Sequence, residues 1–248
     1  MGLRLMCTTA HPDDESAAFG GSLLMAHEQG VETSVICMTD GNAATFRGEA
    51  KNAAELAAMR RKEFAAACNQ LGVAHGEVLD LQDGQLPHAD FYQAAGELVQ
   101  RIRRYRPQVI LTFGSEGGVN LHRDHTMVSL MTTAAFHWAG RSAYFPEQIA
   151  QGFAAYAPQK LYVLQAPFLA SREAERTTAI TPCSLRLDLD QYKQKKLDAF
   201  LMHSTQRGVV DRVRDEFDKH GGQECYLLVA SRIDGCSDTS LFGGVQED

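Results

Sequence analysis

The first half of the chain alternates short apolar segments with helical ones, and this alternation most constrains its fold. Apolar runs typical of strands lie at residues 3–8, 31–38, 78–81 and 109–113. Segments with helical spacing of their apolar residues lie between them, at 16–29, 50–71 and 91–105. Strands joined by helices lie parallel in one sheet, so we expect a Rossmann-like α/β fold, mostly parallel, with helices on both faces.

The second half of the chain is less regular. Its predicted helices lie at 124–138, 191–202 and 209–219, and its predicted strands at 160–165 and 225–229. A length of 248 residues fits one α/β domain. We therefore expect a single domain over 1–248, in which 1–139 form the α/β core with the metal site. Residues 140–248 form a substrate loop and a less regular C-terminal lobe.

Composition argues against several classes of protein. Charged residues make up 22% of the chain and hydrophobic residues 44%, which is a globular balance rather than a disordered one. The net charge of −7 argues against nucleic-acid binding. No apolar run is long enough for a signal peptide or a membrane span, so we expect a cytoplasmic protein. Six cysteines without a C-x-x-C pair are expected to be buried thiols. The sequence does not decide between a monomer and a homo-oligomer.

A polar cluster, Ala-His-Pro-Asp-Asp-Glu at residues 10–15, directly follows the first predicted strand. Its simplest interpretation is a helix start, because proline presets the first turn and acidic side chains favour the positive end of the helix dipole. The same residues place one imidazole, His11, beside two carboxylates, Asp13 and Asp14. That combination is sufficient to begin a metal site.

A second cluster, His-Arg-Asp-His at residues 122–125, follows the apolar strand 109–113 and a glycine-rich loop. Alone, it would also fit a solvated helix cap. Because ligands of an α/β sheet bind beyond the carboxyl ends of its strands, we expect the two clusters to form one composite site. One histidine and one carboxylate from the first cluster, with one histidine from the second, supply the three ligands of a catalytic zinc site. Other carboxylates remain for acid–base chemistry.

The two clusters, in this order, resemble those of the LmbE/PIG-L family of zinc-dependent N-acetylglucosaminyl deacetylases. The resemblance covers the first half of the chain continuously. It extends to Thr-Asp-Gly at 39–41, Arg-x-x-Glu at 60–63, Asp-Gly-x-Leu at 83–86 and His-Ser-Thr-Gln at 203–206. It implies a hydrolase that removes the N-acetyl group from an N-acetylglucosamine-containing small molecule or conjugate, releasing acetate and a free amine. The expected partner is therefore an amino-sugar conjugate.

The resemblance also implies roles for six residues. The zinc ligands would be His11, Asp14 and His125, and the catalytic residues would be Asp13, His122 and Asp124. Asp13 would be the general base toward the attacking water. His122 would protonate the leaving amine or stabilise the oxyanion, and Asp124 would orient His122. Zinc is the expected cofactor, although two imidazoles and one carboxylate also suit iron, cobalt or nickel.

Three further residues are candidates for contacts with the substrate, namely Arg60, Asn120 and Arg123. Arg60 equally fits an ordinary ion pair with Glu63 on the surface of a helix. Arg123 replaces a proline that is frequent in the family, and it would place a cation near the substrate or face solvent. Two other functions stay open. They are a related zinc amidase for a larger N-acyl group or a thiol conjugate, and a sugar-binding protein without turnover.

Overall fold

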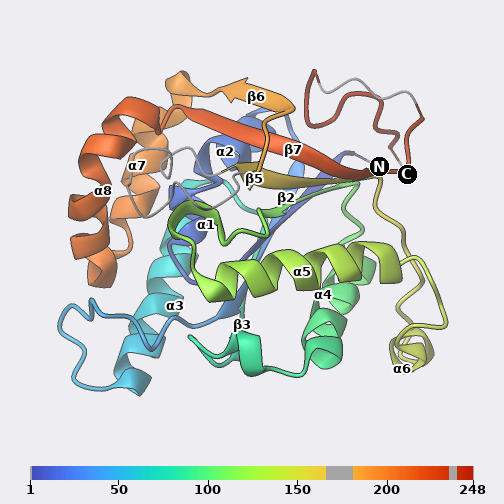
Figure 1. Ribbon diagram of the computed structural model, residues 1–248, viewed down its shortest axis with the longest axis horizontal. Coiled ribbons are helices and arrows are strands. Elements are labelled where there is room, and N and C mark those ends of the chain that lie inside the picture. Colours follow the sequence, from blue (N-terminus) through green and yellow to red (C-terminus); the bar gives the residue numbers. More distant parts are fainter. Residues whose placement is uncertain (1, 166–180, 235–238, 248) are drawn as a thin grey trace.

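The computed structural model describes residues 2–165, 181–234 and 239–247, and its centre is one sheet (Figure 1). The strands of the described chain follow the order β3-β2-β1-β4-β5-β7-β6 across this sheet. Their bounds are β1 (Arg4–Thr9), β2 (Glu32–Thr39), β3 (His75–Leu81), β4 (Val109–Phe113), β5 (Lys160–Gln165), β6 (Leu185–Asp188) and β7 (Gln223–Ser231). β1 to β5 pair in parallel, whereas β7 is antiparallel to both β5 and β6. The expected mostly parallel α/β fold is confirmed.

Helices cover both faces of the sheet (Figure 1). Their bounds are α1 (Asp14–Ala17), α2 (Gly20–Glu28), α3 (Ala53–Gln70), α4 (Phe91–Tyr105), α5 (Arg123–Trp138), α6 (Pro146–Ala150), α7 (Lys193–Leu201) and α8 (Arg207–His220). Short 3-10 turns are η1 (Leu86–His88), η2 (Gly118–Asn120), η5 (Asp190–Tyr192) and η6 (Ser204–Gln206). α4 and α5 contact each other and β1, while α1, α2 and α3 all contact α7. The C-terminal lobe therefore shares a layer with the N-terminal helices.

α4 shows how the sequence specifies one of these helices. The Asp90 side chain accepts a hydrogen bond from Gln93 N at 3.0 Å and caps the start of the helix. Arg106, in a left-handed conformation, ends it directly before Pro107. The apolar stripe between these signals is buried. The observed bounds of α4 are accordingly the predicted ones, 91–105.

Several elements differ from the prediction; α6 was not expected, and two other differences have a clear physical cause. The expected helix 16–29 is divided into α1 and α2. The second helix has its own start because the Glu224 carboxylate, on β7, accepts hydrogen bonds from Gly21 N at 2.9 Å and Ser22 N at 3.1 Å. The short strand β6 was not expected, since four residues carry little periodicity and pairing with β7 is what forms it.

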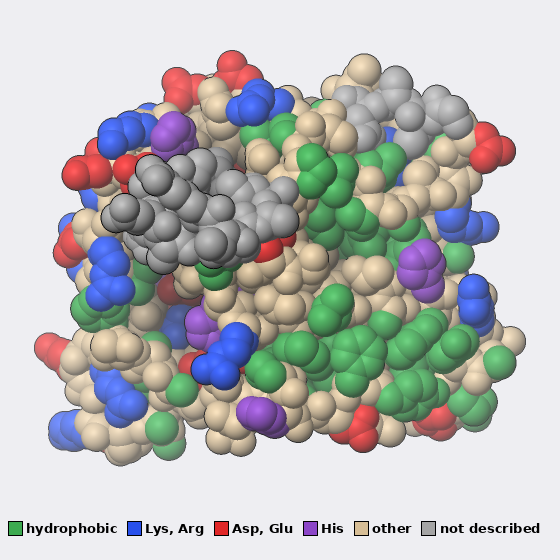
Figure 2. All heavy atoms as spheres, viewed as in Figure 1, with side chains coloured by type: hydrophobic (Ala, Val, Ile, Leu, Met, Phe, Trp, Pro, Cys, Tyr) green, Lys and Arg blue, Asp and Glu red, His purple; other side chains and the backbone are tan. Residues whose placement is uncertain are grey.

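Hydrophobic side chains gather on the surface over α4 and α5 (Figure 2). Phe91, Tyr92 and Leu130 are exposed there, and the rings of Tyr92 and Trp138 lie 5.6 Å apart. No helix of the described residues is long and apolar enough to cross a membrane. The oligomeric state stays a prediction.

The cysteines of the described residues are free thiols, and most lie in the core. The buried ones are Cys7, Cys37, Cys68 and Cys225, as expected from their scatter along the chain. Cys183 is half-buried, and Cys236 lies outside the described residues. Burial raises the pKa of Cys7 well above its ordinary value, so this residue stays an uncharged thiol.

The order of the strands changes direction at β1. β2 and β3 lie on one side of β1, and β4 and β5 lie on the other. β1 pairs in parallel with β4, so residues 10–15 and 114–125 leave neighbouring strands at the same edge of the sheet. This edge is where an open α/β sheet binds its ligands.

Candidate metal and catalytic site

The loop after β1 folds back on itself and directs its polar side chains into one cavity. The Asp14 carboxylate accepts hydrogen bonds from the main-chain N–H groups of Ala10 at 3.1 Å and His11 at 2.8 Å. Asp13 precedes α1 and has a φ of 136°, a conformation that residues with a side chain rarely adopt. The side chains of His11, Asp13 and Asp14 all line the cavity.

The side chains of His11, Asp14 and His125 bring two imidazole nitrogens and the oxygens of one carboxylate together. His125 Nε2 lies 3.2 Å from Asp14 Oδ1 and 3.3 Å from His11 Nδ1. His11 Nδ1 lies 3.5 Å from Asp14 Oδ2. Two ligands bound at about 2.0 to 2.1 Å to a tetrahedral ion are about 3.3 to 3.4 Å apart, so these atoms fit zinc in both type and spacing. His122 also lies near the two other histidines, and the three imidazoles form a second possible ligand set.

Hydrogen bonds fix which nitrogen each imidazole presents. His125 Nδ1 donates to Gly117 O at 3.1 Å, which leaves Nε2 for a ligand role. His11 Nε2 lies 3.1 Å from Asp83 Oδ1 and 3.4 Å from Asp124 Oδ2, which leaves Nδ1. Burial opposes a charge on His11, but hydrogen bonds to the surrounding carboxylates outweigh burial and raise its pKa well above the ordinary value. Carboxylates that favour a bound proton this strongly also favour a metal cation.

Asp13 and His122 line the cavity beside these ligand atoms. Burial raises the pKa of Asp13 to about 6, against the opposing effect of the Arg60 charge. Burial, assisted by the neighbouring histidines, lowers the pKa of His122, so this imidazole is uncharged at neutral pH. The cavity therefore holds a carboxylate suited to proton transfer near neutrality, beside a neutral imidazole that can donate a hydrogen bond.

The predicted contact between the Asp124 carboxylate and His122 is corrected by the structure. The two residues are joined through the main-chain N–H of Asp124, which donates to His122 Nδ1 at 3.1 Å. The Asp124 carboxylate accepts hydrogen bonds from Gly84 N at 2.7 Å and Leu86 N at 3.2 Å, and it faces His11 Nε2. The turn after β3 holds this side chain, so it supports a possible metal ligand rather than the imidazole of His122.

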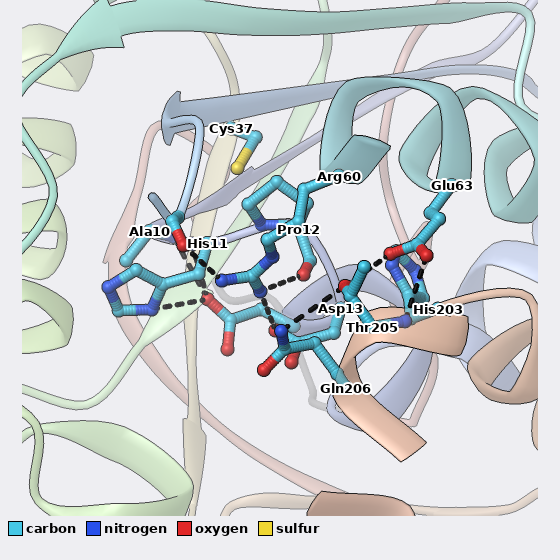
Figure 3. Close-up of polar contacts among 12 residues, drawn as sticks. Ala10, His11, Pro12, Asp13, Cys37, Arg60, Glu63, His203, Thr205 and Gln206 are labelled. Carbon is cyan, nitrogen blue, oxygen red and sulfur yellow. Dashed lines mark hydrogen bonds and ion pairs between the residues drawn. The ribbon is translucent and has the colours of Figure 1, made fainter. Parts of the chain in front are cut away.

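Arg60 and Glu63 are both buried on α3, and their side chains point to different partners (Figure 3). Arg60 Nη1 donates to Gly41 O at 2.7 Å and Nη2 donates to Pro12 O, while Nη2 lies 3.4 Å from Asp13 Oδ1. Gly41 has a φ of 68°, and a Cβ there would overlap the Arg60 guanidinium. Glu63 turns toward the segment after α7. The surface ion pair is therefore wrong, and contact of Arg60 with a substrate stays a prediction.

A cavity of about 360 Å³ lies between the metal loop and the helices of the C-terminal lobe. On the side of α7 and α8 it is lined by Phe200, Val209, Val213 and Phe217, together with Arg212 and Glu216. Asn120 also lines the cavity, whereas Arg123 is exposed on α5 and lies outside the described lining. Contacts of Asn120 and Arg123 with a substrate stay predictions.

Three residues that the sequence left without a role lie within or behind the site. Asp83 faces His11, as described above, and it follows β3 at the same edge of the sheet as the two clusters. That position is the signal by which sequence reasoning would place it here. Glu15 accepts a hydrogen bond from Asp13 N at 2.9 Å and contacts His203 at 2.7 Å. Glu15 and His203 are 188 residues apart, so local spacing offers no comparable signal for this pair.

Comparison with known proteins finds a family match over the part of the chain that contains both polar clusters. The model of the PIG-L family, described as GlcNAc-PI de-N-acetylase, matches residues 6–136. Mycothiol S-conjugate amidase from Streptomyces coelicolor is 35% identical over 182 residues, which cover 66% of this chain and 61% of that protein. The chain thus matches less than two thirds of the length of that relative.

Two further proteins are similar over more of their length. 1D-myo-inositol 2-acetamido-2-deoxy-alpha-D-glucopyranoside deacetylase from Thermobifida fusca is 31% identical over 241 residues, covering 83% of this chain and 84% of that protein. The solved structure of N,N'-diacetylchitobiose deacetylase from Pyrococcus horikoshii superposes with a TM-score of 0.75 at 20% identity, covering 91% of this chain and 83% of that one. The structural similarity shows a shared fold.

Proposed function

Because this chain belongs to the PIG-L (GlcNAc-PI de-N-acetylase) family, we propose that it hydrolyses the N-acetyl group of an N-acetylglucosamine-containing small molecule or conjugate. Acetate and a free amine are the products. The observation that carries this proposal is the convergence of three possible ligand side chains, His11, Asp14 and His125, beside the cavity that the Asp13 carboxylate lines. A relative at 31% identity, named as a deacetylase of an acetamido sugar joined to inositol, supports the choice of substrate class.

Zinc is the metal that we propose for His11, Asp14 and His125. Their two imidazoles and one carboxylate match a catalytic zinc site in donor type, and the distances between their nitrogen and oxygen atoms are similar to those between the ligands of a tetrahedral ion. The same donors also accept iron, cobalt or nickel. When bound, the metal would polarise the substrate carbonyl and acidify the attacking water.

Asp13 is the general base of this mechanism. Its carboxylate lines the cavity, and its pKa of about 6 leaves it ionised at neutral pH yet able to take up a proton. Asp13 removes one proton from the water that attacks the acetamide carbon. It returns this proton to the amine nitrogen as the C–N bond breaks, so the carboxylate is regenerated in each turnover.

His122 stabilises the negative charge that develops on the acetamide oxygen. Its Nδ1 accepts the hydrogen bond from Asp124 N, so the neutral ring carries its proton on Nε2. The lowered pKa keeps the ring neutral, which makes Nε2–H a hydrogen-bond donor rather than a source of protons. An uncharged donor aimed at the oxyanion is a recurrent device in amide hydrolysis.

An amidase for a larger N-acyl group or a thiol conjugate is the second candidate. The specific observation in its favour is the apolar lining formed by Phe200, Val209, Val213 and Phe217, which suits an apolar substituent. The relative at 35% identity is named as a mycothiol S-conjugate amidase. Both candidates use the same bond-breaking residues and differ in which part of the substrate contacts α7 and α8.

The direct test is release of acetate or of a larger acid from a panel of N-acylglucosamine compounds. The panel varies the acyl group and the group attached to the sugar, and each compound is offered to chelator-treated protein and to the same protein restored with zinc. Zinc-dependent acetate release supports deacetylation. Zinc-dependent cleavage restricted to compounds with a larger acyl group or a thioether favours the amidase, and metal binding with no cleavage of any compound contradicts both.

A further inference from the structure

The peptide group between Pro12 and Asp13 is held at both ends. Its carbonyl oxygen, on Pro12, accepts a hydrogen bond from Arg60 Nη2, and its N–H, on Asp13, donates to Glu15 Oε2 at 2.9 Å. Figure 3 shows Arg60 reaching across from α3 to this loop. Two hydrogen bonds on opposite edges of one peptide plane fix the rotation of that plane, and this rotation determines the φ of Asp13.

The φ of Asp13, 136°, is a conformation that the surrounding structure has to enforce. If either hydrogen bond is lost, the peptide plane is free to rotate and φ returns to the negative range that residues with a side chain prefer. The carboxylate of Asp13 leaves its place in the cavity when this happens, because the side chain moves with its backbone. The position of the proposed general base therefore depends on the residues that hold the peptide.

Glu15 is held in turn by the C-terminal lobe. Its carboxylate is fully buried, and Oε1 accepts hydrogen bonds from Ser16 Oγ at 2.6 Å and from His203 Nε2 at 2.7 Å. His203 is itself fully buried between α7 and η6. Without the His203 donor, the Glu15 carboxylate would be a buried charge with fewer partners, and it would move to find water or another donor.

α3 contacts both the Pro12–Asp13 peptide and the segment that carries His203. Arg60 contacts the peptide directly, and Glu63, one helical turn further on, fixes the segment that carries His203. Glu63 Oε1 accepts hydrogen bonds from Ser204 Oγ at 2.6 Å and Thr205 N at 2.8 Å, and Oε2 accepts one from Thr205 Oγ1 at 2.6 Å. The Arg-x-x-Glu and His-Ser-Thr-Gln segments thus meet beside the catalytic loop, where Glu63 lies next to Thr205 and His203 (Figure 3), and Arg60 and Gln206 line the cavity.

We propose that Arg60, Glu15 and His203 are positioning residues that lock the Pro12–Asp13 peptide and thereby aim the Asp13 carboxylate at the attacking water. This inference rests on the proposed role of Asp13 as the general base. It assigns the C-terminal segment a part in positioning the base, because the His203 side chain holds the Glu15 carboxylate that in turn holds the Asp13 N–H.

The test compares His203→Leu, which removes the donor to Glu15, with His203→Gln, whose side-chain amide keeps a donor at a similar distance. In the zinc-loaded enzyme we expect His203→Leu to lower kcat by on the order of 10²-fold, because displacement of a reacting group by about 1 Å has such an effect. KM and zinc stoichiometry stay at wild-type values, and His203→Gln restores kcat to within about threefold. His137→Leu, on the exposed side of α5, is the matched control and keeps wild-type kcat.

Crystal structures of the same variants give a readout that does not depend on activity. We expect a negative φ at Asp13 in His203→Leu and a positive φ in His203→Gln. If His203→Leu does not fold, Glu15→Gln replaces it, because an amide cannot accept hydrogen bonds from Asp13 N and His203 Nε2 as a carboxylate does. A His203→Leu enzyme with wild-type kcat and a positive φ overturns the inference, as does a loss of kcat that His203→Gln fails to restore.

Asp13→Asn, measured beside these variants, separates this inference from the proposed function. If Asp13→Asn retains full activity, the base role is wrong and the inference fails with it. If Asp13→Asn is inactive while His203→Leu is normal, the base role stands and only the positioning role is overturned.

Discussion

Replacement of Asp83 by asparagine should weaken zinc binding although Asp83 is not itself a proposed ligand. Asp83 Oδ1 lies 3.1 Å from His11 Nε2, and Asp83 Oδ2 accepts a hydrogen bond from Ala43 N at 2.7 Å. An asparagine has one acceptor oxygen, so it satisfies either Ala43 or His11 and turns an N–H group toward the other. If the amide oxygen faces Ala43, His11 Nε2 loses the acceptor that directs Nδ1 toward the metal. If it faces His11, Ala43 N loses its acceptor and the side chain at position 83 is held less firmly.

The expected loss of zinc affinity depends on Asp124, the second carboxylate that faces His11. Loss of a hydrogen bond that orients a metal ligand usually weakens metal binding by roughly 10- to 100-fold. Asp124 Oδ2 remains at 3.4 Å from His11 Nε2 and still orients the ring. We therefore expect the lower end of that range, an increase of about tenfold in the zinc Kd, which corresponds to about 1.4 kcal/mol.

Competition with a chromophoric zinc chelator measures this Kd directly. Asp80→Asn is the matched control, because it makes the same substitution on β3 at a side chain that is 95% exposed and pairs with Arg61. A zinc Kd of Asp83→Asn equal to that of the wild type would show that the contact of Asp83 with His11 does not support metal binding. An equal loss in Asp80→Asn would show that net charge, rather than the contact with His11, controls the affinity.

Three further outcomes follow from buried contacts elsewhere in the chain. Lys196→Met removes one partner of a buried ion pair with Glu224, at 2.7 Å, and should lower the free energy of unfolding by about 3 to 5 kcal/mol in urea titrations. Val213→Asp places a charge in the apolar lining of the cavity and should raise KM more for amides with an apolar substituent than for plain N-acetyl sugars, in parallel assays. Burial opposes the charged form of both His203 and Glu15, but their mutual attraction raises the pKa of His203 and lowers that of Glu15. The contribution of this pair to the free energy of unfolding should thus be greatest between pH 4.5 and 6.5. It should decline as the pH falls through the pKa of Glu15 in the folded state, and also as the pH rises through the pKa of His203 in the folded state. The difference in unfolding free energy between wild type and His203→Gln, in urea at pH 5.5 and 8.5, should be larger at about pH 5.5 than at about pH 8.5.

Local signals explain which elements were predictable from the sequence. α4 carries a capping aspartate, an apolar stripe and a proline stop, so both of its ends were predicted. β4 is a continuous apolar run and β5 is apolar in its centre, and their predicted bounds were likewise the observed ones. The division of the expected helix 16–29 escaped prediction because the capping group is the Glu224 carboxylate, which is about two hundred residues away in the chain.

The same distinction holds within the site. The two polar clusters were expected together because each follows a strand, and neighbouring parallel strands end at one edge. The choice of His11, Asp14 and His125 as ligands came from the family resemblance. The direction of the Asp124 carboxylate was mispredicted, since the turn 83–86 that holds it comes from a different part of the chain. The partners of Arg60 also depend on tertiary contacts, and its helical spacing with Glu63 was misleading for that reason.

In the proposed zinc-dependent deacetylation, Asp13 activates the attacking water. The most direct test is acetate release by zinc-loaded wild type and Asp13→Asn, with bound zinc measured in the same samples. We expect Asp13→Asn to keep equimolar zinc and to lose activity by about 10²- to 10⁴-fold, the usual contribution of a general base. Undiminished acetate release by Asp13→Asn with zinc bound would contradict it.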